Sequence, residues 1–124
     1  MSLPLLVVDG ANVVGSVPDG WWKDRAGAAV RLRDRLVRIT GTGVRDVPGP
    51  VEVVLVVEGQ ARDIPAAEGV RLVRAPGSGD DAIVTTVSAA GPGRTVVVVT
   101  ADRELRDRVR ALGATVIGPS SIPR

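Results

Sequence analysis

The hydrophobic pattern of the chain is dominated by runs rich in valine and leucine at residues 5–8, 51–57 and 95–100. The alternating faces of each run are largely apolar, which is typical of strands buried on both sides within a parallel sheet. Shorter apolar segments at residues 70–74 and 115–117 predict further strands. The pattern therefore predicts a central, mainly parallel sheet of four to five strands.

A helical period occupies residues 21–39. Apolar residues recur there at spacings of three and four and predict one buried face: Trp22, Ala26, Ala29, Leu32, Leu36 and Ile39. Arginines fall mostly on the other side: Arg25, Arg31, Arg35 and Arg38. We interpret them as a solvated helix face rather than a phosphate-binding stripe. With Trp22 in the core, Trp21 points away and can stack on a base or contact a partner protein.

Two more helices are predicted at residues 80–90 and 103–112. The first turns Ile83, Val84 and Val87 inward, and the second turns Leu105, Val109 and Leu112 inward, with Gly113 as its C-terminal cap. Residues 13–20 and 40–50 carry glycine and proline and are predicted loops. Residues 60–69 are expected to be irregular or briefly helical, and the proline- and serine-rich tail to be loosely held.

Strands and helices thus alternate along a chain of 124 residues, which fits a single domain over residues 1–124. Such alternation favours an α/β fold, a three-layer sandwich with helices on both faces of the parallel sheet. In open sheets of this kind, ligands bind outside the carboxyl ends of the strands. Side chains that directly follow the strands are therefore the first candidates for a functional site.

The composition narrows the chemistry. The chain has no His, Cys or Tyr, which excludes Ser-His-Asp and Cys-His nucleophilic arrangements and disfavours zinc. A metal here would take oxygen ligands, which points to Mg²⁺ or Mn²⁺. The absence of cysteines, of a membrane-length apolar run and of a leader segment leads us to expect a cytoplasmic protein without a membrane partner. The net charge of +2 is low, although arginine makes up nearly all the basic residues.

Acidic residues follow the predicted strands. Asp9, Glu58 and Asp102 each come directly after or soon after an apolar strand, and Asp80 with Asp81 begins a predicted helix. Each acid has a structural alternative as a helix N-cap or first-turn charge. Carboxylates gathered at one edge would repel one another and raise one another's pKa, and a divalent cation would relieve that repulsion. One of Asp80 and Asp81 is expected to be a cap or a first-turn charge of the helix and the other to face the site, and the sequence leaves open which.

A carboxylate-bound metal supports in-line displacement at a phosphorus centre and needs no histidine. Asn12, one turn beyond Asp9, can orient a carboxylate or the scissile phosphate. Ser78, in the loop before Asp80, is a candidate substrate contact. Arg103, next to Asp102, either contacts phosphate or is a solvent-exposed charge.

With these residues in hand, the chain resembles a YacP-like NYN domain of the PIN-like ribonuclease superfamily. The resemblance rests on VDGANVVG at residues 8–15, GDDAI at 79–83, VVVTAD at 97–102 and LGA at 112–114. It covers nearly the whole chain in the expected order. It implies a PIN-like fold and a ribonuclease that depends on Mg²⁺ or Mn²⁺.

The same resemblance implies roles for single residues. Asp9, Asp80, Asp81 and Asp102 match the acidic metal ligands of the family, and Asn12 matches its asparagine. Glu58 stands where relatives tend to carry Asp, so it is a further candidate ligand with one more carbon. The partner implied is RNA, including tRNA or RNA on the ribosome, and a homodimer is left open.

Two other classes of protein compete with this interpretation. The first is a non-catalytic RNA- or ribosome-binding module that keeps the fold without efficient metal binding. The second is a flavodoxin- or receiver-like domain. The second is disfavoured because the single lysine, Lys23, is not at a late strand, and because no Walker or G-x-G-x-x-G loop follows a strand.

Overall fold

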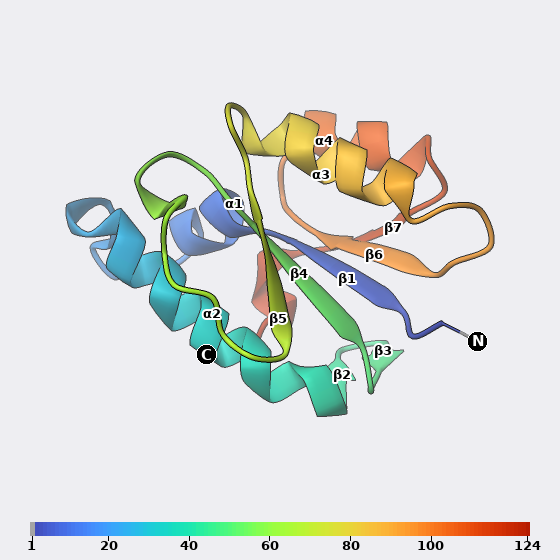
Figure 1. Ribbon diagram of the computed structural model, residues 1–124, viewed down its shortest axis with the longest axis horizontal. Coiled ribbons are helices and arrows are strands. Elements are labelled where there is room, and N and C mark those ends of the chain that lie inside the picture. Colours follow the sequence, from blue (N-terminus) through green and yellow to red (C-terminus); the bar gives the residue numbers. More distant parts are fainter. Residues whose placement is uncertain (1) are drawn as a thin grey trace.

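The computed structural model describes residues 2–124. Its centre is a five-stranded sheet in the order β5-β4-β1-β6-β7, with every neighbouring pair parallel (Figure 1). The strands are β1 (Leu5–Asp9), β4 (Glu52–Val57), β5 (Val70–Arg74), β6 (Val96–Val99) and β7 (Thr115–Ile117). The predicted strands and their parallel arrangement are confirmed.

Helices cover both faces of the sheet (Figure 1). On one face lie α1 (Gly10–Gly15) and α2 (Arg25–Thr42), and on the other α3 (Gly79–Ala89) and α4 (Arg103–Arg110). Leu32 and Leu36 belong to the core on the first face, and Ile83 and Leu105 to the core on the second. Each is fully buried, as expected for aliphatic residues at helical spacing. The predicted α/β three-layer architecture is confirmed.

The central strand β1 has β4 and β5 on one side and β6 and β7 on the other. Val8 pairs with Leu55 of β4 on one side and with Val99 of β6 on the other. The connection to β4 runs through α2 on one face, whereas the connection from β5 to β6 runs through α3 on the opposite face. The carboxyl end of β1 beside β6 is therefore a topological switch point, where open α/β sheets bind ligands.

The prediction of one helix over residues 21–39, with Trp22 in its apolar face, is wrong. Trp21–Lys23 forms a short 3₁₀ helix, and α2 begins after Asp24, whose Oδ1 accepts a hydrogen bond of 2.9 Å from the Gly27 N–H. This N-cap places Trp22 outside the helix, whereas the predicted positions Ala29, Leu32, Leu36 and Ile39 are buried as expected. Trp21 consequently packs against the core, and Trp22 is 55% exposed.

Two predicted loops contain regular structure. The segment at 13–20 begins inside α1, which ends at Gly15. In the segment at 40–50, α2 continues to Thr42 and a two-stranded hairpin of β2 (Gly43–Val44) and β3 (Val47–Pro48) follows. None of the helices described for residues 2–124 combines the length and apolarity that a membrane crossing requires.

The C-terminal tail and the end of α4 also differ from expectation. Pro119–Ser121 forms a 3₁₀ helix, and Ile122 is buried in the core beneath α1 and α2 rather than loosely held. The helix α4 ends at Arg110, so Leu112 lies beyond it and is 48% exposed instead of facing inward. Gly113 ends this segment with φ 91°, the left-handed conformation expected of a C-terminal cap.

These corrections predict that two similar truncations change the free energy of unfolding by very different amounts. Ile122→Ala should lower the free energy of unfolding by about 2–4 kcal/mol, because it leaves a cavity in the core. Leu112→Ala should change it by less than about 0.5 kcal/mol, because that side chain is largely in water. Urea denaturation of both variants checks this, and equal losses would contradict the packing of the tail.

Candidate functional site

Asp9 is the buried acid at the carboxyl end of the central strand, with 6% of its surface exposed. Its Oδ1 accepts a hydrogen bond of 3.3 Å from the Asn12 N–H, so it caps α1. Its Oδ2 accepts a hydrogen bond of 2.9 Å from Thr100 Oγ1, directly after β6. The carboxylate is therefore fixed across the switch point between β1 and β6.

Burial raises the pKa of the Asp9 carboxyl from 3.8 to about 6. The hydrogen bonds from Thr100 and Asn12 work in the opposite direction, and the charges of Asp80 and Glu58 add to the increase. A carboxyl group whose charged form is disfavoured by burial and by like charges gains from any cation nearby. Buried, perturbed acids of this kind cluster at functional sites.

The raised pKa predicts a stability difference between the wild type and Asp9→Asn in metal-free buffer. The folded-state pKa of about 6 exceeds the unfolded value of 3.8, so the folded protein binds this proton more tightly. The contribution is fully present at low pH and is lost as the pH rises to about 6, amounting to about 3 kcal/mol. Urea midpoints with a chelator between about pH 4 and pH 7 should show the wild type losing stability relative to the variant. Parallel curves would contradict the raised pKa.

Thr100 is a site residue that the sequence analysis missed. Besides donating to Asp9, its Oγ1 accepts a hydrogen bond of 3.1 Å from the Asp102 N–H, and the residue is 1% exposed. It thus connects two acids that are far apart in the sequence. The available signal was a polar residue directly ending a strand of valines, because a buried hydroxyl needs a partner.

Asn12 and Asp102 lie on either side of this connection. Asn12 Oδ1 accepts a hydrogen bond of 2.8 Å from the Ala101 N–H, which ties α1 to the loop before α4. Asp102 caps α4, since its Oδ1 accepts a hydrogen bond of 2.9 Å from the Leu105 N–H. The capping alternative is therefore correct for both Asp9 and Asp102. The Oδ2 atom of Asp102 takes no part in the cap.

Glu58 reaches from the end of β4 to the start of α3. Its Oε2 accepts a hydrogen bond of 2.7 Å from the Gly79 N–H. Ser78 is the N-cap of α3 and accepts a hydrogen bond of 3.2 Å from the Asp80 N–H through Oγ. Ser78 is therefore the cap, and Asp80 and Asp81 both lie in the first turn, which is the other alternative that the sequence analysis gave for this pair.

Asp80 and Asp81 face different surroundings. Burial raises the pKa of Asp80, and the charges of Asp102 and Glu58 raise it further, with Arg108 opposing. Asp81 instead accepts a hydrogen bond of 3.1 Å from Arg108 Nη2 and has 74% of its side chain exposed. Asp80 is thus the member of the pair that shares the electrostatic field of Asp9, Glu58 and Asp102, four acids we call the acidic edge.

The acidic edge fits a particular kind of metal binding. Among residues 2–124, no group of three or more His, Cys, Asp or Glu side chains is placed to enclose a metal ion. Mg²⁺ retains several waters and commonly takes one or two carboxylates with substrate phosphates, rather than an all-protein cage. The oxygen donors and their mutual repulsion fit a hydrated Mg²⁺ or Mn²⁺, and they do not fit a closed structural site.

A pocket of about 370 Å³ adjoins the acidic edge on the β4 side. Gly10, Glu58 and Trp21 line it, and the Arg25 guanidinium lies 5.0 Å from the centre of the Trp21 ring. The Trp21 ring and the Arg25 guanidinium thus form a cation–π pair at this pocket. Arg103 is exposed on the first turn of α4, next to Asp102.

The parallel five-stranded sheet with helices on both faces is an α/β fold that matches the PIN-like fold. Crystal structures of Rae1 (YacP) from Bacillus subtilis have the same fold. One is 17% identical in sequence with a TM-score of 0.75, covering 96% of this chain and 71% of that chain. A second, of a tryptophan-to-leucine mutant, is 16% identical with a TM-score of 0.74, covering 97% and 72%. The chain therefore has the fold of a YacP-like domain.

Comparisons of sequence alone give no further assignment. No protein-family model matches the chain. No curated protein matches it either. The likeness to Rae1 (YacP) is thus a likeness of fold at low identity.

Proposed function

We propose that this chain is a metal-dependent ribonuclease whose catalytic residues form the acidic edge. The observation that carries the proposal is the buried Asp9 carboxylate, held by Thr100 and Asn12 and subject to the charges of Asp80 and Glu58. A buried acid with such neighbours is costly for a structural cap alone and useful for holding a cation at a reacting phosphate. The YacP-like sequence motifs support the same activity.

Asp9, Asp80 and Asp102 would hold Mg²⁺ or Mn²⁺, with Glu58 and Asp81 as outer candidates. When bound, the metal supplies Lewis-acid stabilisation of the phosphoryl oxygens and activates water. The side-chain oxygen of Asn12 already accepts a hydrogen bond from the Ala101 N–H, so Asn12 would contact the substrate through its NH₂ group. Its NH₂ group is left to donate to a phosphoryl oxygen of the substrate.

The surroundings of the acidic edge favour single-stranded RNA. Trp21, with Arg25 over its ring, offers a stacking surface for an unpaired base in the adjoining pocket. Arg103 and Ser78 are proposed as further substrate contacts, beside Asp102 and Asp80 respectively. Both tRNA and RNA on the ribosome expose such unpaired bases. A homodimer would add further contacts to the RNA.

A second candidate function is a non-catalytic RNA- or ribosome-binding module. The observation in its favour is that no three acidic side chains among residues 2–124 are placed to enclose a metal. The two functions differ in whether bound RNA is cut.

Cleavage of mixed single-stranded RNA with Mn²⁺ tests the proposal. The wild type should cut the RNA, a chelator should stop it, and Asp102→Asn should lose most of the activity. Asp107→Asn is the matched control, because Asp107 is an exposed acid of the same helix outside the acidic edge. Equal cleavage by all proteins would indicate a contaminant, and binding without cleavage would favour the second function.

A further inference from the structure

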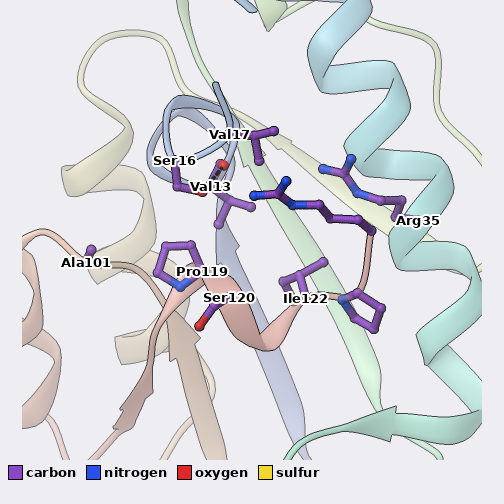
Figure 2. Close-up of a pocket in the computed structure, with 10 residues that line it drawn as sticks. Val13, Ser16, Val17, Arg35, Ala101, Pro119, Ser120 and Ile122 are labelled. Atoms are coloured by element: carbon purple, nitrogen blue, oxygen red, sulfur yellow. Dashed lines mark hydrogen bonds between the residues drawn. The ribbon is translucent and has the colours of Figure 1, made fainter. Parts of the chain in front are cut away.

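A separate cavity of about 440 Å³ lies on the β6–β7 side of α1 (Figure 2). Its walls come from four parts of the chain: α1 and its C-cap with Val13 and Ser16, α2 with Arg35, the residue Ala101 after β6, and the tail with Ile122 and Arg124. Nothing in the function proposed above uses this cavity. It brings together arginines from distant parts of the sequence.

The cavity adjoins the acidic edge. Ala101, which lines it, precedes Asp102 and donates its N–H to Asn12. The helix α1, which contributes Val13 to the cavity wall, begins directly after Asp9. A strand of RNA whose scissile phosphate lies at the acidic edge therefore has this cavity as a neighbouring position on one side and the Trp21 pocket on the other.

Arg35 is one of four arginines that the sequence analysis placed on a solvated face. Arg25, Arg31 and Arg38 are exposed as expected, and the interpretation is wrong for Arg35 alone. The side chain is half-buried and points into the cavity (Figure 2). Its Nε atom is buried and, among residues 2–124, has no hydrogen-bond acceptor. A buried donor without a partner costs free energy, so such an atom calls for an acceptor that the chain itself does not supply.

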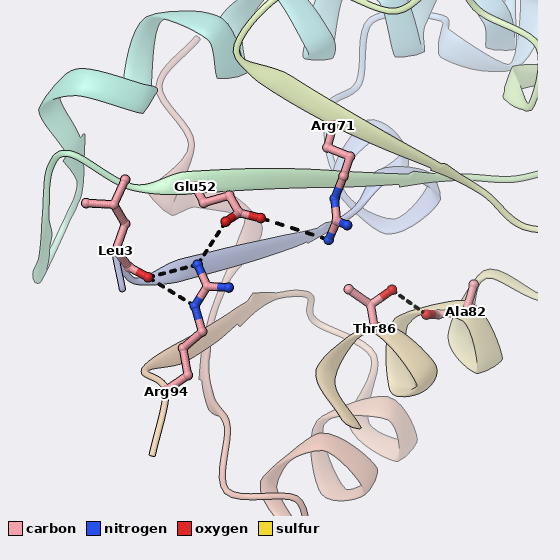
Figure 3. Close-up of polar contacts among 6 residues, drawn as sticks. All are labelled: Leu3, Glu52, Arg71, Ala82, Thr86 and Arg94. Carbon is pink, nitrogen blue, oxygen red and sulfur yellow. Dashed lines mark hydrogen bonds and ion pairs between the residues drawn. The ribbon is translucent and has the colours of Figure 1, made fainter. Parts of the chain in front are cut away.

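Other arginines of the protein show what a satisfied guanidinium looks like. Arg33, on the same helix, donates to the Pro65 carbonyl and to Asp34. Arg94 donates to the Leu3 carbonyl and pairs with Glu52 at 2.9 Å (Figure 3). Arg35 and Arg124, within the described part of the chain, have no comparable carboxylate or carbonyl partner.

The electrostatics of the cavity favour an anion. Burial lowers the pKa of the Arg35 guanidinium, Asp19 opposes this, and the charges of Arg124 and Arg31 lower it further. An arginine remains protonated under these conditions, so the cost appears as unrelieved repulsion among cations. An anion in the cavity would remove that repulsion.

We propose that this cavity binds a backbone phosphate of RNA next to the scissile one, with the attached ribose against its apolar wall. The proposal rests on the ribonuclease or RNA-binding function above. A guanidinium fork matches two phosphate oxygens, and the Ser120 hydroxyl that lines the cavity adds a neutral donor, whereas the Ser16 hydroxyl already donates to the Val13 carbonyl oxygen. Val13, Val17 and Ile122 supply apolar surface for a sugar, and the volume exceeds that of a bare ion.

Binding of a fluorescent single-stranded RNA of about a dozen nucleotides tests the proposal, with anisotropy measured in a metal chelator. Arg35→Gln should weaken binding roughly tenfold and reduce the salt dependence by about one phosphate contact. Arg38→Gln is the matched control, because it removes the same charge from an exposed position of α2 that does not line the cavity. Equal affinity of Arg35→Gln and Arg38→Gln would overturn the proposal.

A further variant and a set of competitors distinguish RNA from other anions as the ligand of the cavity. Arg35→Lys keeps the charge without the guanidinium fork, so it should bind RNA with intermediate affinity and an unchanged salt dependence. This variant also provides the test if Arg35→Gln does not fold. Unlabelled RNA of the same length should displace the probe far better than uridine 5′-monophosphate, inorganic phosphate or a poly-glutamate peptide. Displacement by any of these at matched phosphate or carboxylate concentration would overturn the assignment to RNA.

The two proposals fail in different ways. Because the binding measurements exclude metal, loss of RNA affinity in Arg35→Gln stands even if no cleavage is ever found. Cleavage that depends on Asp102, together with unchanged RNA binding by Arg35→Gln, would instead retain the nuclease and remove the phosphate site.

Discussion

Asp9→Asn should reduce RNA cleavage by about a hundredfold or more, which corresponds to about 3 kcal/mol of transition-state stabilisation. The substitution keeps the size of the side chain and removes its charge. The side-chain oxygen that remains can still accept from the Asn12 N–H, so α1 keeps its cap. The loss of activity would therefore come from the missing negative charge at the switch point.

The folding of this variant provides the internal control. Since burial disfavours the Asp9 charge, Asp9→Asn should be at least as stable as the wild type above about pH 6. Asp63→Asn removes an exposed acid away from the acidic edge and should leave the cleavage rate unchanged. A fully active Asp9→Asn would rule out Asp9 as a catalytic residue.

Gly10→Ala should produce a large loss of stability although it adds only a methyl group. A Cβ at this position would lie 2.5 Å from the Val56 carbonyl oxygen and 3.2 Å from Leu55 Cδ1, so α1 or β4 has to shift. Because backbone atoms in a strand cannot move as easily as a side chain, we expect the free energy of unfolding to fall by about 3 kcal/mol and Tm to decrease by roughly 10 °C. Because Asn12 lies on α1, the same shift should reduce cleavage.

Gly15→Ala is the matched control within the same helix. Its added Cβ would meet Trp21 Cζ2 at 3.8 Å, an ordinary contact, so the variant should be neutral or slightly more stable. Thermal unfolding of both variants decides the matter. Equal Tm values would contradict the close packing of α1 on β4.

The order of strands and helices could be predicted because valine runs and helical spacing are local signals. The sequence interpretation of Gly10 was less complete. This residue entered the sequence analysis only as part of the VDGANVVG motif, whereas the structure requires glycine there because the backbone of β4 passes so close. Close approach between distant segments leaves no local pattern.

The surroundings of the tryptophans and of the tail were inaccessible for a related reason. The Asp24 cap shifts the start of α2 and exchanges the positions of Trp21 and Trp22. Ile122 is buried because α1 and α2 leave space beneath them, which a proline- and serine-rich segment does not reveal. Periodicity correctly predicted the buried residues within α2, but it did not show that the helix begins after Trp22.

The candidate site was predictable as a set of acids and not as a geometry. The rule that parallel strands present their carboxyl ends at one edge placed Asp9 and Asp102 together. The choice between Asp80 and Asp81 depended on the Ser78 cap and on Arg108 from α4, which holds Asp81 away. Thr100 depended on the side-by-side pairing of β1 and β6.

The central claim is that the acidic edge holds a divalent cation, and anomalous diffraction from crystals soaked in Mn²⁺ tests it most directly. We expect a manganese peak within ligand distance of Asp9 and of Asp80 or Asp102, with water completing the coordination, and no such peak in Asp9→Asn. A wild-type crystal without manganese at this edge, or with manganese elsewhere alone, would contradict the account.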